Sequence, residues 1–305
     1  MRVVVIRDQP PRSGNGFAAQ DAQHAECWHD GGMETALASH APATTRDRVR
    51  QVTVLVGAIV AIGGAAVGSG AFGGQPIADA ADGALSATAT PLAPDTPAFS
   101  IWSLIYLGLG VFAVVQALPR QGADPRLRAV SWWVLASMLL NALWIGVVQA
   151  GSVGGSVVVI LTLLAVLATI FVKLVRIAHT GIATSLITDT TMGLYLGWVS
   201  VASLANIAAF LTVADVGELG LGATGWSVVV LAAGAALSVA YAVFGRTRPS
   251  VIVPIGLAMA WGLGWIGLGR TNGPLVDETV ATAAFAAAAV ALLAPIVTSL
   301  VARRR

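Results

Sequence analysis

Long apolar runs separated by short polar segments fill the chain from residue 52 to its end. A helix that crosses the hydrocarbon core of a bilayer needs about 20 mostly apolar residues. Eight runs reach that length, and each of them predicts one transmembrane helix. Their approximate bounds are 52–73, 99–118, 130–149, 153–174, 190–213, 225–245, 251–269 and 279–302. The pattern therefore predicts an all-α, polytopic membrane helix bundle with about eight transmembrane helices.

Arginine and lysine alternate with these runs in a regular way. They cluster before the first run and after the second, fourth, sixth and eighth, whereas the opposite side carries acidic residues and the single basic residue Arg270. The clustered residues are Arg46, Arg48, Arg50, Arg120, Arg126, Arg128, Lys173, Arg176, Arg246, Arg248, Arg303, Arg304 and Arg305. Because basic loops remain in the cytoplasm, both termini are predicted to be cytoplasmic. Adding or removing one span would destroy this alternation.

Composition supports a membrane location. Hydrophobic residues make up 56% of the chain and charged residues 10%, and the mean hydropathy is +0.81. A soluble domain needs more charge than this on its surface. The net charge of +2 and the pI of about 9.1 follow from the cytoplasmic basic segments, and they do not indicate a nucleic-acid partner. The excess of arginine over lysine is typical of a bacterial protein, so we expect a multi-pass protein of the cell (plasma) membrane.

Residues 1–50 form a polar segment ahead of the first apolar run, which begins too late for a cleaved signal peptide. We expect a disordered N-terminal tail, with Met33 as a candidate for the true start. His24, Cys27 and His29 lie in this tail, but a structural zinc site uses four ligands and no fourth is at hand. No metal site is therefore predicted.

Three of the predicted helices carry aromatic and amide side chains on one face. At about 100° per residue, each set falls within a narrow arc of its helix. The sets are Phe99, Trp102 and Tyr106 in the second helix, Asn141 and Trp144 in the third, and Tyr195, Trp198 and Asn206 in the fifth. If the three faces meet, they enclose a cavity with flat apolar walls and a few hydrogen-bonding groups, as small-molecule sites do.

Simpler interpretations of the same residue types remain open. Tryptophan concentrates at membrane interfaces as an anchor, which is the role we expect for Trp132, Trp133 and Trp226. Asparagine side chains also bridge helices by hydrogen bonds, and such a role does not exclude ligand contact. Two glycine pairs have the spacing that permits two helices to approach closely, namely Gly64 with Gly68 and Gly193 with Gly197.

The sequence contains no sign of conventional catalysis. No acidic or basic residue lies in the middle of a predicted span, which argues against a proton pump or an ion-coupled transporter. No nucleophile elbow, phosphate-binding loop or pair of carboxylates is present. We therefore expect a protein that is not an enzyme.

Three stretches, at 97–110 (PAFSIWSLIYLGLG), 139–144 (LLNALW) and 194–210 (LYLGWVSVASLANIAAF), resemble motifs of one known family. That family is the TspO/MBR family of tryptophan-rich sensory proteins, which are related to the mitochondrial translocator protein, or peripheral benzodiazepine receptor. The resemblance covers residues 51–213, which would form a five-helix core with a long loop at 74–96. Residues 214–305 would then be a three-helix membrane extension with a basic tail. The sequence departs from the family pattern at 190–193, where a proline and an aromatic residue are often found.

The resemblance implies a receptor or carrier that binds a flat hydrophobic ligand inside the membrane. Such a ligand would be a porphyrin or other tetrapyrrole, including haem, or a sterol-like molecule, and its role would be sensing or transport. The eight aromatic and amide residues become the expected ligand-binding positions, with no required cofactor and with a homodimer as the expected assembly. Two alternatives stay open: a secondary transporter of a small hydrophobic substrate, and a tetrapyrrole-degrading enzyme that depends on light and oxygen.

Overall fold

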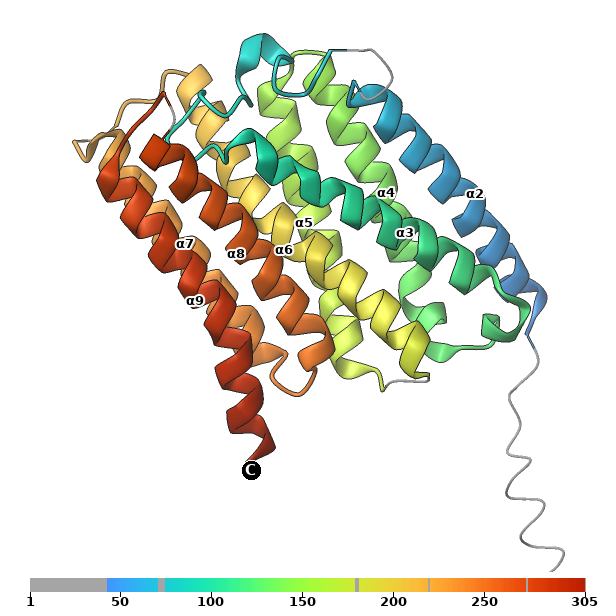
Figure 1. Ribbon diagram of the computed structural model, residues 1–305. Coiled ribbons are helices and arrows are strands. Elements are labelled where there is room, and N and C mark those ends of the chain that lie inside the picture. Colours follow the sequence, from blue (N-terminus) through green and yellow to red (C-terminus); the bar gives the residue numbers. More distant parts are fainter. Residues whose placement is uncertain (1–42, 71–74, 179–180, 219, 273, 305) are drawn as a thin grey trace, which may run out of the picture. The chain divides into compact units, whose positions relative to one another are not determined.

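The computed structural model describes residues 43–70, 75–178, 181–218, 220–272 and 274–304, which belong to one compact unit (Figure 1). The expected tail, the start at Met33 and the group of His24, Cys27 and His29 all lie outside the described residues. Within the described ranges, the regular structure is entirely helical. The predicted fold class is therefore confirmed.

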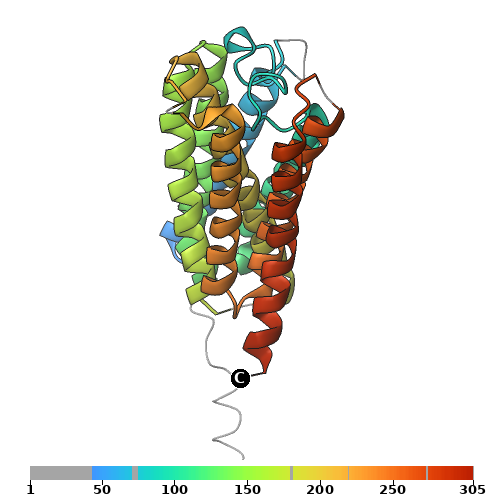
Figure 2. The same ribbon diagram turned by 90° about the vertical axis from the view of Figure 1, so that its left-hand side faces the viewer.

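Eight α-helices among the described residues are long and apolar enough to cross a membrane, and each corresponds to one predicted span. They are α2 (Thr45–Gly68), α3 (Ile101–Ala117), α4 (Pro125–Gln149), α5 (Val153–Arg176), α6 (Ile182–Val213), α7 (Gly222–Phe244), α8 (Pro249–Asn272) and α9 (Glu278–Arg303). Their axes run nearly side by side, as Figures 1 and 2 show. The chain thus forms a multi-pass membrane protein whose outer surface contacts lipid.

Several helices begin earlier than their apolar runs. Helix α4 begins at Pro125 because the carboxylate of Asp124 accepts hydrogen bonds from the first backbone N–H groups. Helix α6 begins at Ile182, although its apolar run begins only near residue 190. Polar residues that the hydropathy pattern places in loops are therefore part of membrane helices.

One of these residues is Asp189, which is 0% exposed. Its Oδ1 accepts a hydrogen bond from Nη2 of Arg126, also buried, at 2.5 Å, and its Oδ2 accepts one from the hydroxyl of Ser250 at 2.5 Å. Both charged residues lie near the starts of their helices and outside the predicted spans, so the prediction of no charged residue in the middle of a span still holds for them. A buried ion pair joins α4 to α6, and a serine joins α6 to α8.

The three C-terminal helices are packed into the bundle. Helix α8 lies between α6 and α9 (Figure 1), and it buries a larger share of its central residues than any other of the eight spans. A Cβ added to Gly193 would lie 2.6 Å from the carbonyl oxygen of Val251, and one added to Gly197 would lie 2.9 Å from Cβ of Ala258. The predicted close approach at this glycine pair therefore occurs, and its partner is α8. At the other pair, a Cβ added to Gly64 would meet no atom within 4 Å, so only Gly68 lies against a neighbouring helix, at Ile145 of α4.

Residues 75–98 form a loop of turns and short 3-10 helices, including Ala81–Gly83 and the start of Thr96–Ser100. The loop lies at the end of the bundle where α3 begins and α8 ends, which is the upper end in Figures 1 and 2. Gln149, at the end of α4, donates hydrogen bonds from Nε2 to the carbonyl oxygens of Gly68 and Gln75, both at 2.8 Å. This side chain therefore ties both the end of α2 and the start of the loop to the end of α4.

At the same end, Asp277 caps the start of α9. A hydrogen bond from the hydroxyl of Thr224 and bonds from backbone N–H groups, including that of Val280, hold the pKa of Asp277 below its ordinary value of 3.8. A carboxyl whose pKa is lower in the folded state stabilises the protein above its unfolded pKa. That contribution is lost as the pH falls through the folded pKa.

We therefore expect Asp277→Asn to reduce the acid sensitivity of the fold below about pH 4. The measurement is the thermal unfolding midpoint in detergent micelles between pH 2.5 and pH 6. The matched control is Asp79→Asn, at an exposed position of the loop. If Asp277→Asn and the parent lose stability equally below pH 4, the proposed contribution of this carboxylate is wrong.

Candidate functional site

Trp102 of α3 is the centre of an aromatic cluster inside the bundle. Its ring stacks on Tyr106 of the same helix, with centroids 5.3 Å apart and an interplanar angle of 19°. It meets the rings of Tyr195 and Trp198 on α6 edge-on, at 5.9 and 6.2 Å. Phe99 meets Trp198 in the same manner at 5.7 Å. The aromatic faces of α3 and α6 therefore point toward each other, in arrangements that aromatic rings prefer.

The amide side chains connect this cluster to α4 and α5. Asn141 donates a hydrogen bond from Nδ2 to the hydroxyl of Tyr106 at 2.8 Å. The indole Nε1 of Trp144 donates to Oδ1 of Asn206 at 2.8 Å, and Nδ2 of Asn206 donates to the hydroxyl of Ser156 at 2.9 Å. The two asparagines therefore bridge helices, which was the simpler interpretation, and they do so within the aromatic cluster.

All eight residues singled out from the sequence lie in this one cluster. Four of them are at most 2% exposed, namely Asn141, Tyr195, Trp198 and Asn206. Phe99, Trp102, Tyr106 and Trp144 are half-buried. By contrast, Trp132 and Trp133 have exposed fractions of 47% and 39%, as expected of interface anchors.

The sequence pattern missed two contributors to the cluster. Ser156 lies on α5, where no aromatic or amide side chain lies within two turns of it, so nothing in the spacing marks this serine. On α8, a Cβ added to Gly262 would lie 3.4 Å from Cζ3 of Trp198, so this helix backs the indole ring. Both contributions come from helix packing and could not be found by comparing residues along one helix.

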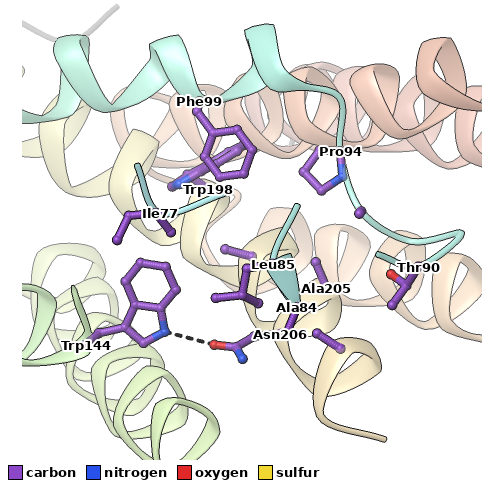
Figure 3. A pocket seen from close by; sticks show the side chains of 13 residues that line it. Ile77, Ala84, Leu85, Thr90, Pro94, Phe99, Trp144, Trp198, Ala205 and Asn206 are labelled. Atoms are coloured by element: carbon purple, nitrogen blue, oxygen red, sulfur yellow. Dashed lines mark hydrogen bonds between the residues drawn. The ribbon is translucent and has the colours of Figure 1, made fainter. Parts of the chain in front are cut away.

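Two small cavities of about 40 and 20 Å³ adjoin the cluster and share Phe99, Trp144, Trp198 and Ala202. The larger one extends under the 75–98 loop, which contributes Ile77, Ala84, Leu85, Thr90, Ala93 and Pro94 to its lining. Figure 3 shows the side chains of Ile77 and Leu85 near the indole of Trp144. Sites for drug-sized molecules measure about 300–1,000 Å³. The space present is therefore too small for a porphyrin, and part of its wall must move before one can bind.

Two residues that line the larger cavity have a buried polar side-chain atom without a hydrogen-bond partner among the described residues. These atoms are Nε1 of Trp198, which belongs to a side chain 1% exposed, and the hydroxyl oxygen of Thr90, 3% exposed. A buried polar group without a partner destabilises a fold by about 1–3 kcal/mol. A bound molecule with a hydrogen-bond acceptor would satisfy the indole N–H. Elsewhere in the described ranges, no three His, Cys, Asp or Glu side chains gather into a metal-binding group.

Fold and site together define a polytopic membrane protein with an aromatic, amide-bridged cluster between its helices. A family model described as "TSPO-like protein" matches residues 51–297. The chain belongs to this family, as the three motifs predicted. The match extends well beyond residue 213 and includes α7, α8 and most of α9. Neither the curated proteins nor the solved structures contain a match.

Proposed function

We propose that the protein is a membrane receptor or carrier for a flat hydrophobic ligand, a tetrapyrrole or a sterol-like molecule, which binds at the aromatic cluster. The observation that carries the proposal is the convergence of Phe99, Trp102, Tyr195 and Trp198 from two helices beside a cavity under a loop. Flat rings stack favourably on such side chains. Family membership supports the same class of function.

The unused polar groups narrow the class of ligand. A mainly apolar cavity wall with an indole N–H at Trp198 and a hydroxyl at Thr90 suits an apolar ring system that carries an oxygen acceptor. The propionates of a porphyrin and the hydroxyl of a sterol both provide such an oxygen. On this proposal the protein binds its ligand without altering it, and it is not an enzyme.

Protoporphyrin titration of the purified protein in nanodiscs, followed by tryptophan fluorescence quenching, tests the proposal. We expect saturable binding in the parent and at least a roughly fivefold weaker affinity in the Trp102→Ala, Trp198→Ala double variant, since each aromatic contact contributes about 0.5–1.5 kcal/mol. The matched control is the Trp132→Ala, Trp226→Ala double variant, which removes two exposed indoles. Equal affinities for protoporphyrin in the parent and both double variants would refute binding at the aromatic cluster.

Trp198→Phe provides a milder test if the double variant does not fold. It keeps an aromatic ring but removes the indole N–H, so a ligand that accepts this hydrogen bond should bind several-fold more weakly. A sterol titration run in parallel decides between the two ligand classes. Illumination of the loaded protein in air should leave the porphyrin spectrum unchanged, whereas bleaching that requires the protein would indicate the degrading enzyme.

The buried Arg126–Asp189 pair favours a second candidate function, a secondary transporter. Charged residues inside membrane helices often mark the pathway of a coupled ion, and these two side chains are buried near the starts of α4 and α6. Uptake of the hydrophobic ligand into proteoliposomes, with and without a proton gradient, tests this candidate. Gradient-dependent uptake by the parent protein would establish it, and gradient-independent binding would favour the receptor.

A further inference from the structure

The loop over the larger cavity is held in place chiefly by α8. The guanidinium of Arg270 donates from Nη1 to the carbonyl oxygen of Thr90 at 3.1 Å and from Nη2 to that of Ala87 at 3.0 Å. Thr90 also lines the cavity. A side chain near the end of α8 therefore fixes the part of the loop that forms the cavity roof.

Two tryptophans of α8 hold the end of the same loop. Nε1 of Trp261 donates to the carbonyl oxygen of Ala98 at 2.9 Å. The backbone carbonyl of Trp265 accepts a hydrogen bond from the N–H of Asp95 at 3.3 Å. These contacts extend the attachment from the middle of the loop to the 3-10 helix Thr96–Ser100, which carries Phe99 and leads into α3 with Trp102.

Arg270 is an unusual residue for this position. Among the described residues it is the single basic residue at the end of the bundle that carries the loop, and it is 1% exposed. A buried guanidinium is costly unless acceptors use its donors. Here two loop carbonyls act as acceptors, and the carboxylates of Asp95 and Asp277 interact with it electrostatically. Lifting the loop would separate the buried guanidinium of Arg270 from both of these carbonyl acceptors.

The size of the cavity makes the loop the part that must move. Six of the thirteen lining residues belong to the loop, and the other seven lie in the 3-10 helix Thr96–Ser100, on α4 and on α6. The helices are fixed by the aromatic and amide contacts described above, whereas the loop consists of turns tied down at a few points. Displacing Ile77 and Leu85 with the loop would enlarge the space beside Trp144.

We propose that Arg270, together with Trp261 and Trp265, forms a latch that holds the 75–98 loop closed over the ligand site. Arg270 is then a positioning residue for ligand binding, and α8 sets how readily the site opens. The use of the latch for ligand access rests on the proposed function. The latch itself can be tested without any ligand.

The test measures how often the loop opens. Ala93 lines the cavity and is 6% exposed, so the thiol introduced by Ala93→Cys reacts with a water-soluble maleimide only when the loop lifts. The background carries Cys27→Ser, which removes the chain's one cysteine. We expect Arg270→Gln to increase the labelling rate at least about tenfold, because it replaces charge-assisted hydrogen bonds with weaker ones.

Two controls separate loop opening from general loosening. Arg246→Gln, at an exposed position before α8, should label at the parent rate. A thiol from Ala58→Cys, in the middle of α2 and 1% exposed, should stay unlabelled in the Arg270→Gln background. If Arg270→Gln does not fold, Trp261→Phe removes one indole donor and should still raise the Ala93→Cys labelling rate.

Unchanged labelling of Ala93→Cys in Arg270→Gln and in Trp261→Phe would overturn the latch, whether or not protoporphyrin binds to the parent. Faster labelling together with faster protoporphyrin association in Arg270→Gln would support both proposals. Faster labelling with no protoporphyrin or sterol binding in any variant would support the latch and refute the proposed function. Equal labelling of Ala58→Cys and Ala93→Cys would also overturn the latch, since the whole bundle would then be opening.

Discussion

Replacing Gly197 by leucine is expected to abolish the folded bundle. A side chain at this position would run into the carbonyl oxygen of Ile255 and Cβ of Ala258 on α8. Overpacking a core usually destabilises it by about 1–3 kcal/mol, because neighbouring side chains can shift. Here the obstacle is largely helix backbone, so α6 and α8 would have to separate and the loss should exceed that range. Because α6 also carries Tyr195 and Trp198, the ligand site would be lost with it.

The measurement for Gly197→Leu is the yield of monodisperse protein in detergent and its unfolding midpoint. Gly264→Leu is the matched control, since it introduces the same side chain into α8 at a position where a Cβ meets no atom within 4 Å. We expect Gly264→Leu to behave like the parent. A folded Gly197→Leu variant with the parent's midpoint would contradict the close packing of α6 on α8.

The second large effect is expected from Asp189→Asn. This substitution leaves the buried guanidinium of Arg126 without its carboxylate and weakens the bond to Ser250. Breaking one partner of a buried ion pair typically destabilises a protein by about 3–5 kcal/mol. Equilibrium unfolding in mixed micelles with increasing sodium dodecyl sulfate measures the free energy of unfolding. The control is Asp215→Asn, at an exposed position with a φ of 50°, which asparagine tolerates well.

A double substitution distinguishes a missing charge partner from a missing contact. Arg126→Met combined with Asp189→Leu removes both charges and keeps much of the volume, so the double variant should be more stable than Asp189→Asn alone. If the double variant instead loses as much stability as the single variants Arg126→Met and Asp189→Leu lose together, the two residues act independently. The pair would then not be the feature that joins α4 to α6.

Much of this fold could be predicted because apolar runs of membrane length are a strong signal. All eight runs correspond to helices, and the angular positions of residues such as Trp102 and Trp198 correctly predicted which faces would meet. Helix periodicity is a local property, so it can be read from each segment alone. The membrane location and the family follow from the same local signals.

The remaining features depend on contacts between distant segments. Asp189 lies just before an apolar run, so hydropathy places it in a loop, whereas Arg126 and Ser250 stabilise it inside the bundle. Arg270 looked like an exception to the charge pattern, and only the folded loop shows which carbonyls it binds. The small size of the cavity results from side-chain packing under the loop, and no spacing rule predicts it. Whether a tetrapyrrole or a sterol binds there stays a prediction.

The close packing of α8 on α6 has a consequence for truncated forms of this protein. A chain cut after Val213 would keep every aromatic and amide residue of the cluster. It would lose α8, however, so Gly193 and Gly197 of α6 would face lipid. It would also lose Arg270 and both tryptophans that hold the loop. We therefore expect a five-helix fragment to lack both the packing of α6 and the attachment of the loop that the whole chain has.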